Sequence, residues 1–296
     1  MTNYLLKMVA IYSKSFDEHS AEVIRRLLEI LKQEVLIYKP LYEYLLSKTP
    51  MSISISDTFN GYGDLPKTAR FLISVGGDGA FLNSINIVRD SGIPVIGINT
   101  GRLGFLANIN KNDLQKPVEQ LLAGELPVEE RSLIHATING KHVVDFPYSL
   151  NDAVIRKSAA GLITVHTWSN DEFLNSYWAD GVIVATPTGS SAYSLSVGGP
   201  IVAPEAQNFI ISPIAAHNLN VRPLVIPDNV TLKLKAECRN NDGHFTLSLD
   251  SRSVECISGT EIEIRRAEFK VKIVKSASFY TTLRNKLMWG IDKRNP

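Results

Sequence analysis

The hydrophobic pattern of the first 130 residues alternates between two periods. Between residues 17 and 34, apolar side chains recur every three or four positions, which predicts an amphipathic helix. Shorter helices are predicted at 41–47, 81–90 and 113–122. Continuous apolar runs that stop at Ser, Pro or Gly predict buried strands at 8–12, 35–38, 71–75 and 95–99, with 51–67 mostly loop. Strand, helix and strand in turn predict a parallel sheet with helices on both faces.

The pattern changes near residue 130, where helical stretches become scarce. Short strand-like runs follow, and Asn139-Gly140 between two of them is a strong hairpin signal. The runs lie at 135–138, 143–144, 153–155, 162–167, 182–185, 230–234, 245–249 and 261–264. We therefore expect an α/β domain over 1–130 and a mostly β domain over 131–268. The last stretch, 269–296, holds a strand-like run and a polar tail.

Composition narrows the class of protein. The chain of 296 residues is longer than one typical domain, and its hydrophobic share of 44% predicts a large core. Lys+Arg 31 against Asp+Glu 30 gives a net charge of +1, so no basic field favours nucleic acid. Cys238 and Cys256 are too few for a disulfide scaffold. Neither a signal peptide nor a membrane span is apparent, and we expect a cytoplasmic protein by elimination.

A glycine turn follows the predicted strand at 71–75. Its residues are Gly76, Gly77, Asp78 and Gly79, and a predicted helix begins just behind them. Free backbone N–H groups in such a turn, with a helix start behind, form a natural phosphate site. A carboxylate there would repel phosphate, so Asp78 needs another role: a metal ion, a sugar hydroxyl or proton abstraction. The structural alternative is that Asp78 only caps the helix.

A second glycine run lies at 100–106, directly after the predicted strand at 95–99. Gly101 and Gly104 suggest another close approach of the backbone. Arg102 between them is suited to neutralising phosphate, although a solvated arginine is the default. In an open parallel sheet, ligands bind at the carboxyl ends of the strands. Both glycine runs are predicted to lie at such ends.

The second half holds the richest motif, which runs from Asp180-Gly181 through a strand to 186–194. Hydroxyl groups and backbone amides at a strand end suit a ligand with many polar edges, such as a nucleotide; a Pro-Gly turn with a serine N-cap is the structural alternative. Asn151-Asp152 is suited to a base edge and ribose hydroxyls, or is an exposed turn. His217 has no triad partner by sequence and reads as structural.

Taken together, these stretches resemble the NAD kinase family. The matching motifs occur in the family's order across residues 71 to 290. They are Gly76-Gly77-Asp78-Gly79, the run 101–106, Asn151-Asp152, Asp180-Gly181 with 186–193, the run 212–223 and Leu287-Met288-Trp289-Gly290. The glycine turn alone also resembles lipid kinases of the diacylglycerol type and 6-phosphofructokinases. The Thr-Pro-Thr-Gly-Ser-Ser-Ala-Tyr run at 186–193 is the specific part.

The resemblance implies a fold and a chemistry. The expected fold is an N-terminal Rossmann-like doubly wound domain and a C-terminal β-sandwich-like domain, with the tail from 269 packing back on the first domain and the site in the cleft between them. The implied reaction transfers a phosphoryl group from ATP to the 2′-hydroxyl of the adenosine ribose of NAD. The family uses Mg²⁺ or another divalent metal, for which no protein ligand is assigned, and forms homodimers or homotetramers.

The resemblance also assigns residues. Asp78 would be the general base, and Gly76, Gly77 and Gly79 would line the phosphates. Asn151 and Asp152 would hold the adenosine part of NAD. The rest of the binding set is Asp180, Thr188, Ser191, Ala192, Tyr193, Ser194, Leu195, Ser196, His217 and Arg252.

Four positions, in three of the motifs, depart from the family's pattern. Asp152 stands where many members have Glu, so its carboxylate must reach about one methylene further. Ser191 replaces the usual threonine and keeps the hydroxyl. Asp250-Ser251-Arg252 replaces the more usual Asp-Gly-Gln, which puts the amide contact in doubt or adds a charge near a phosphate.

Other functions stay open on the sequence alone. They are a kinase for a lipid or sugar phosphate, a nucleotide sensor without turnover, and a dehydrogenase, which lacks the expected G-x-G-x-x-G fingerprint. Polyphosphate as donor, NADH as acceptor, feedback by NADP and the size of the oligomer are likewise open.

Overall fold

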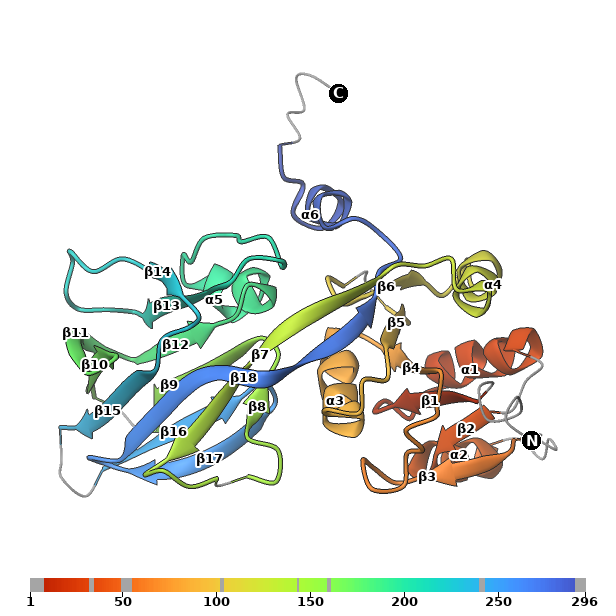
Figure 1. Ribbon diagram of the computed structural model, residues 1–296, viewed down its shortest axis with the longest axis horizontal. Coiled ribbons are helices and arrows are strands. Elements are labelled where there is room, and N and C mark those ends of the chain that lie inside the picture. The colour runs from red at the N-terminus through yellow and green to blue at the C-terminus, as the bar shows by residue number, and fades with distance from the viewer. Residues whose placement is uncertain are drawn as a thin grey trace. The chain divides into compact units, whose positions relative to one another are not determined.

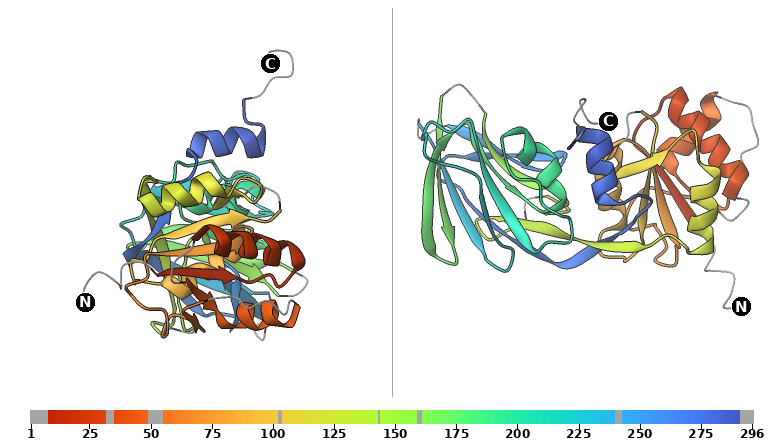
Figure 2. Two further views of the ribbon diagram at one scale, coloured as in Figure 1. Left: turned by 90° about the vertical axis from the view of Figure 1, so that its right-hand side faces the viewer. Right: turned by 90° about the horizontal axis from the view of Figure 1, so that it is seen from above.

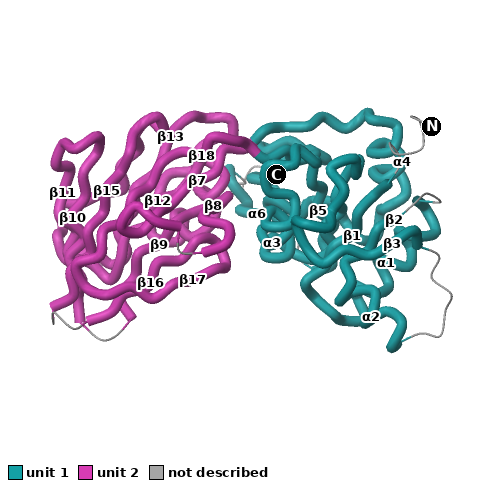
Figure 3. The backbone as a smooth tube through the Cα atoms, turned by 60° about the horizontal axis from the view of Figure 1, so that its bottom comes forward, with its two compact units in different colours: residues 1–130, 271–296 teal, residues 131–270 magenta. Residues whose placement is uncertain are grey.

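A computed structural model describes residues 8–31, 35–48, 55–101, 104–142, 144–158, 161–239 and 243–290. The chain divides into two compact units (Figure 3). Unit 1 comprises residues 1–130 and 271–296, and unit 2 comprises residues 131–270. The chain leaves unit 1 within strand β7 (Val128–Ile138) and returns within strand β18 (Glu261–Val274).

Unit 1 is built on a parallel sheet (Figure 1). Its strands lie in the order β3-β2-β1-β4-β5-β6, and every neighbouring pair is parallel. They are β1 (Val9–Ser13), β2 (Val35–Tyr38), β3 (Asp57–Phe59), β4 (Phe71–Gly76), β5 (Val95–Asn99) and β6 (Ala107–Asn110). The end of β18 also pairs in parallel with β5. The order of β3 to β5 is that of doubly wound nucleotide-binding sheets, which change winding direction between β1 and β4.

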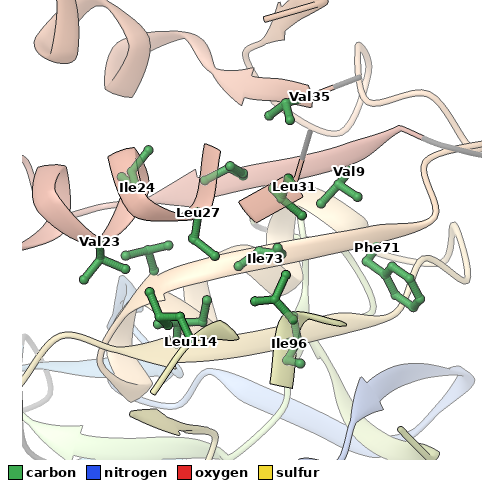
Figure 4. Close-up of a cluster of buried hydrophobic side chains, with 14 of the residues drawn as sticks. Val9, Val23, Ile24, Leu27, Leu31, Val35, Phe71, Ile73, Ile96 and Leu114 are labelled. Atoms are coloured by element: carbon green, nitrogen blue, oxygen red, sulfur yellow. The ribbon is translucent and has the colours of Figure 1, made fainter. Parts of the chain in front are cut away.

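Helices cover both faces of this sheet (Figure 2). They are α1 (Glu18–Leu31), α2 (Lys39–Lys48), α3 (Asp78–Val88) and α4 (Gln115–Ala123); α6 (Phe279–Leu287) also belongs to unit 1. On one face, Ile24 and Leu27 of α1 and Leu114 before α4 pack in one cluster with Ile73 and Ile96 of the strands (Figure 4). Apolar residues recur every three or four positions in α1, which places Ile24 and Leu27 on one side of the helix, and this side packs on the sheet.

Helix α3 lies on the opposite face. Gly97 of β5 alternates with Ile96, and a Cβ built on Gly97 would lie 2.9 Å from the Phe81 ring of α3 and 2.6 Å from Cα of Ala107. Successive residues of a strand point to opposite faces, so Phe81 packs on the face away from the Ile96 cluster. The absence of a side chain at Gly97 therefore lets α3 pack close to the sheet and β6 lie close to β5.

Unit 2 is a sandwich of two antiparallel layers. One sheet has the order β14-β13-β12-β9-β16-β17. Its strands are β9 (Asp152–Lys157), β12 (Gly181–Ala185), β13 (Asn208–Ile214), β14 (Leu224–Pro227), β16 (His244–Leu249) and β17 (Arg252–Ile257). The other layer holds β7, β8 (Tyr148–Ser149), β10 (Ile163–Ser169), β11 (Glu172–Ala179), β15 (Leu232–Cys238) and β18.

One apolar cluster joins the two layers of unit 2. Val182 and Phe245 from the first sheet pack with Val165, Leu234 and Ile262 from the second. The 3₁₀ helix η2 (Thr188–Ser191) and the short helix α5 (Tyr193–Ser196) follow β12. Residues just after α5 pack with the outer face of the first sheet.

The fold class expected from the sequence is confirmed: an α/β unit, a β-sandwich unit and a tail that returns to the first unit. Three local expectations differ. A short strand, β3, lies within the predicted loop at 51–67, and the tail contains α6 where only a polar tail was expected. Of the predicted strand at 143–144, residue 143 lies outside the described residues and Val144 is in a bend. No helix among the described residues is long and apolar enough to cross a membrane.

Candidate functional site

The glycine turn joins β4 to α3 at the carboxyl end of the parallel sheet. Strand β4 ends at Gly76 and pairs with β1, so the turn follows one of the two strands at which the sheet changes winding direction. Crevices outside the carboxyl ends of strands at that point bind ligands in open α/β sheets. The first N–H groups of α3 also have no partner within the helix and attract anions.

The three glycines of the turn differ in their surroundings. Gly76 has φ +145°, and a Cβ there would lie 2.7 Å from Cβ of Ala80, so this position needs glycine for the backbone itself. A Cβ on Gly77 or Gly79 would meet no atom within 4 Å. The space beside Gly77 and Gly79 is open, which leaves their backbone accessible to a ligand.

Asp78 does not cap α3. The N-cap position is Gly77, and no side chain caps that end. Instead, the Asp78 carboxylate accepts hydrogen bonds from three consecutive backbone N–H groups at the end of the second glycine run and the start of β6. Phe105 N donates to Oδ2 at 2.9 Å, while Leu106 N and Ala107 N donate to Oδ1 at 3.0 and 2.9 Å. The alternative of a purely capping aspartate is therefore wrong.

Gly104 explains the second glycine run. A Cβ on Gly104 would lie 1.9 Å from Oδ1 of Asp78, so any side chain there would displace the carboxylate. The close approach expected from this run is thus found at Gly104, with Asp78 as the neighbour. Arg102 lies outside the described residues.

A lysine from the end of the chain also reaches Asp78. Nζ of Lys286 in α6 lies 3.4 Å from Oδ2 of Asp78 and 4.5 Å from the centroid of the Phe105 ring. Sequence reasoning missed Lys286, although it directly precedes the Leu287-Met288-Trp289-Gly290 motif. Lys14, after β1, contacts Asn83 of α3 at 3.5 Å and is a second cation one helical turn beyond the glycines.

In unit 2, the Asn151-Asp152 turn is fixed by hydrogen bonds to the side chain of Asp250. The Asp250 carboxylate accepts N–H bonds from Leu150 at 2.8 Å, Asn151 at 2.9 Å and Asp152 at 3.4 Å. The backbone N–H of Asp250 donates to the carbonyl of Asp152 at 3.1 Å. Thr186 adds a backbone bond to Asn151 O and a hydroxyl bond to Leu150 O. This turn is therefore a rigid part of the sheet end rather than an exposed loop.

Asp152 itself is buried, with 6% of its surface exposed. Burial, and secondarily the charge of Asp250, raises the pKa of Asp152 from 3.8 to about 7. Burial also raises the pKa of Asp250, against the opposing effect of its amide bonds and of Arg252. A carboxyl group with a pKa near neutrality can donate or accept a hydrogen bond at physiological pH.

Arg252 lies beside this carboxylate pair. Its Nη2 is 3.9 Å from Oδ2 of Asp250, and its guanidinium donates to the carbonyl oxygens of Phe146 and Tyr148. It also lies 5.2 Å from the centroid of the Phe146 ring. In this structure Arg252 is thus a counter-ion of Asp250 and also binds the backbone that leads into strand β8.

The hydroxyl-rich run after β12 packs against the same turn. A Cβ on Gly189 would lie 2.0 Å from the carbonyl oxygen of Asn151, so the run and the turn touch through backbone. Ser194 is fully buried and its hydroxyl lies 2.9 Å from that of Ser212, so it supports α5 internally. Tyr193 and Ser196 are exposed, and Thr188, Ser191, Ala192 and Leu195 are half-buried. No side chain caps η2 or α5, contrary to the serine N-cap alternative.

Asp180 and His217 lie elsewhere in unit 2. Asp180 precedes β12 while Asn151-Asp152 lies at its far end, because Ala185 pairs with Asp152 and Gly181 with Arg156. Five strand residues at about 3.4 Å each put the two groups roughly 17 Å apart. Asp180 forms an ion pair of 2.5 Å with Lys157, a residue that sequence reasoning missed, and His217 N donates to Trp178 O.

Within the described part of the chain, no three His, Cys, Asp or Glu side chains come together as a metal-binding group. A Mg²⁺ ion carried by substrate phosphates and water needs only one or two protein carboxylates. The Asp78 carboxylate, 30% exposed at the phosphate-type turn, has the negative charge that would balance such an ion nearby.

The Rossmann strand order, the glycine turn at its switch point and the β-sandwich define a nucleotide-binding α/β-plus-β protein. Comparisons with known proteins agree. The family model for the ATP-NAD kinase N-terminal domain matches residues 9–126, and that for the ATP-NAD kinase C-terminal domain matches residues 150–276. The chain belongs to the NAD kinase family.

Individual relatives match over nearly their whole length. The chain is 41% identical to the NAD kinase of Cytophaga hutchinsonii over 97% of this chain and 99% of the relative. It is 42% identical to the NAD kinase of Christiangramia forsetii, with the same coverage.

Solved structures also match. Among them, an NAD kinase from Archaeoglobus fulgidus in complex with ATP matches with a TM-score of 0.72 at 25% identity, covering 95% of this chain and 98% of that one. Yeast NADH kinase complexed with NADH has the same fold, with a TM-score of 0.83 at 22% identity and coverage of 98% and 90%.

Proposed function

We propose that this chain transfers the γ-phosphoryl group of ATP to the 2′-hydroxyl of the adenosine ribose of NAD, with Asp78 as general base. The observation that carries the role of Asp78 is its carboxylate, fixed by three amides beside an open glycine turn. The ribose oxygen forms a bond to the γ-phosphorus, and the bond from that phosphorus to the bridging oxygen breaks. ADP leaves with the electron pair, and the hydroxyl proton passes to Asp78. The products are NADP and ADP.

Fixing the carboxylate supports catalysis because a ribose hydroxyl is a poor nucleophile near neutral pH. A positioned acid or base contributes about 10²–10⁴-fold to such a proton transfer. Phosphoryl transfer otherwise depends on alignment and on neutralising charge. The amide N–H groups of Gly77 and Gly79, whose surroundings are open, are suited to the phosphates, and Gly76 shapes the turn.

The binding roles in unit 2 follow from the chemistry of each group. Asn151 offers an amide, and Asp152 a carboxyl group that can donate or accept, for the adenosine part of NAD. Thr188, Ser191, Ala192, Tyr193, Leu195 and Ser196, whose surfaces are at least partly exposed, are proposed to bind the rest of the dinucleotide, together with Asp180 and His217. Arg252 acts on this site through Asp250, and Ser194 acts through the packing of α5.

A divalent ion, Mg²⁺ in the simplest case, would enter with the triphosphate and be held by phosphate oxygens and water. When bound, it supplies neutralisation of the charge that develops on the transferred group. We also propose a cytoplasmic location and the use of polyphosphate as an alternative donor.

Assembly into a homodimer or homotetramer is also proposed. Strands β11 and β14 are the outermost strands of their sheets, and both carry exposed apolar side chains. Phe173 and Trp178 on β11 are 57% and 55% exposed, and Leu224 and Val225 on β14 are 38% and 44% exposed. Exposed apolar groups on unpaired strand edges support pairing with a second copy. Light scattering across a range of concentrations measures the mass.

Asp78→Asn tests the proposed base. We expect kcat for NADP formation to fall about 10²–10⁴-fold, because the proton acceptor is lost. NAD binding by calorimetry and the circular dichroism spectrum should stay close to those of the wild type. Asp113→Asn, an exposed aspartate in the same unit, is the matched control and should keep full activity.

Turnover of Asp78→Asn near the wild-type rate would reject Asp78 as the base. Absence of NADP formation by the wild type, with ATP or polyphosphate as donor and with NAD or NADH as acceptor, would reject the proposed reaction as a whole.

A further inference from the structure

The four lone-pair positions of the Asp78 carboxylate are all in use. A carboxylate offers about four such positions, two on each oxygen. Oδ1 accepts from Leu106 N and Ala107 N, and Oδ2 accepts from Phe105 N. The ammonium group of Lys286 takes the fourth position, on Oδ2 at 3.4 Å. A base whose lone pairs are all engaged has no position left for a substrate hydroxyl.

Lys286 is the partner that can leave. The three amides belong to backbone that leads directly into β6, which pairs with β5, so they are fixed by the sheet. Lys286 instead reaches Asp78 through a flexible side chain that is 33% exposed, and its contact is the longest of the four. Phe105, whose ring centroid is 4.5 Å from Nζ, gives the ammonium a second contact that does not involve Asp78.

Helix α6 does not depend on Lys286 for its position. Thr282 and Leu283 are the buried residues of α6, and the N-cap Ser278 accepts a bond from Thr281 N at 3.1 Å. The helix therefore carries Lys286 to Asp78 on a support that is anchored elsewhere. Loss of the ammonium group should leave the fold unchanged.

We propose that Lys286 is an exchangeable counter-ion of the transfer site. In the substrate-free chain it occupies Oδ2 of Asp78. When the triphosphate binds at the glycine turn, the ammonium moves to a terminal phosphate oxygen and leaves Oδ2 free to accept the ribose hydroxyl. This inference rests on the proposed function.

The direction of the exchange follows from charge. A terminal phosphate carries more negative charge than one carboxylate, and the lysine ammonium is a compact point charge on a flexible stem, well suited to phosphate. No bond to Lys286 forms or breaks; it only changes partner. The consequence is a positive coupling between the two substrates, because bound triphosphate clears the position that the acceptor hydroxyl needs.

The experiment measures that coupling directly. NAD is titrated by calorimetry into the full chain, with and without saturating β,γ-methylene ATP, a donor analogue that cannot transfer its phosphoryl group. The variants are Lys286→Met, which keeps the length and loses the charge, and Lys286→Arg, which keeps the charge. Arg284→Met changes a cation on the same helix that contacts Thr281 rather than Asp78, and serves as the control.

In the wild type and in Arg284→Met, the analogue should tighten NAD binding about fivefold or more. In Lys286→Met the ratio of the two dissociation constants should be close to one, and binding of the analogue alone should weaken about tenfold, as for the loss of one charge-assisted contact of about 1.4 kcal/mol. Lys286→Arg should restore part of both effects. The thermal unfolding temperature should be the same in all four proteins. If Lys286 had only a structural role, its loss would lower the unfolding temperature rather than abolish the coupling alone.

Wild-type coupling in Lys286→Met, or no coupling in the wild type, would overturn the exchange. These binding measurements need no turnover. A wild type that shows the coupling but forms no NADP would therefore reject the proposed reaction and leave the exchange standing, whereas active enzyme without coupling would do the reverse.

Discussion

Replacing Asp152 by asparagine should make the protein more stable at alkaline pH and change the way its stability depends on pH. Asp152 is 6% exposed and faces the carboxylate of Asp250. Asparagine has nearly the same shape and is neutral at every pH. The substitution therefore removes the penalty of burying a charge while keeping the volume and one acceptor oxygen.

The magnitude follows from the two pKa values. In the unfolded chain Asp152 loses its proton near pH 3.8, and in the folded chain near pH 7. Between these values the folded state holds a proton that the unfolded state has released, so raising the pH lowers the free energy of unfolding. The contribution is fully present below pH 3.8, is lost progressively up to about pH 7 and is constant above that. Each pH unit in this window changes the free energy by about 1.4 kcal/mol.

From pH 5 to pH 8 the stability of Asp152→Asn relative to the wild type should therefore rise by up to about 3 kcal/mol, the window ending near pH 7. Urea unfolding followed by tryptophan fluorescence measures it, because Trp168 and Trp178 both lie in unit 2 with Asp152. Glu172→Gln, an exposed carboxylate of unit 2, is the control and should show no such trend. A stability difference for Asp152→Asn that is the same at pH 5 and pH 8 would refute the reasoning, because Asp152 would then not be a buried acid with a raised pKa.

Two further substitutions test the contacts that hold Asp78 and Asp250 in place. Gly104→Ala places a Cβ 1.9 Å from Oδ1 of Asp78, so NADP formation should fall at least about tenfold. Gly101→Ala is the control and should stay active, because its Cβ meets no atom nearer than 4.0 Å. Equal rates for the two variants would show that catalysis does not need the amide contacts that hold Asp78. Arg252→Met takes the counter-ion from Asp250 and should lower the free energy of unfolding by about 2–4 kcal/mol, measured in urea at pH 8, and an unchanged midpoint would show that the pair contributes nothing.

The parallel sheet of unit 1 was predictable because its strands are buried on both faces. Strands β1, β4 and β5 are mostly apolar and every residue in them is buried, and such runs can be recognised in a sequence. Their order in the sheet was not legible, because β1 pairs with β4 across an insertion of two further strands. A short apolar run does not reveal which neighbour it chooses.

Helix α6 was missed for a physical reason. It has nine residues, two of them the β-branched Thr281 and Thr282, and only Thr282 and Leu283 are buried. A helix this short is marginal in isolation and gains its stability from docking. Its two buried positions are too few to show a helical period, so the sequence displayed a polar tail where the structure has the support of Lys286.

At the site, too, local features could be predicted from the sequence and contacts between distant residues could not. The glycine turn was visible as a local motif, and its position at a strand end followed from the βαβ pattern. The partners of Asp78 were not visible, because they are backbone amides 27 to 29 residues later and a lysine 208 residues away. Backbone amides have no sequence signature. Among these contacts, the one feature visible in the sequence is Gly104, where a side chain would collide with the Asp78 carboxylate.

The four residues of the glycine turn therefore serve two purposes: an open backbone that suits phosphate, and a carboxylate held in a fixed position. Gly76 is required by its own backbone, whereas Gly77 and Gly79 have open surroundings that neither packing nor a positive φ explains. Asp78, between them, does not cap the helix that it begins but binds the backbone at the end of the second glycine run. Since three of its four hydrogen bonds come from fixed backbone, the carboxylate cannot turn to meet a substrate. The hydroxyl must instead be brought to Oδ2, so the geometry of transfer depends on how NAD is positioned and on when Lys286 gives up its place.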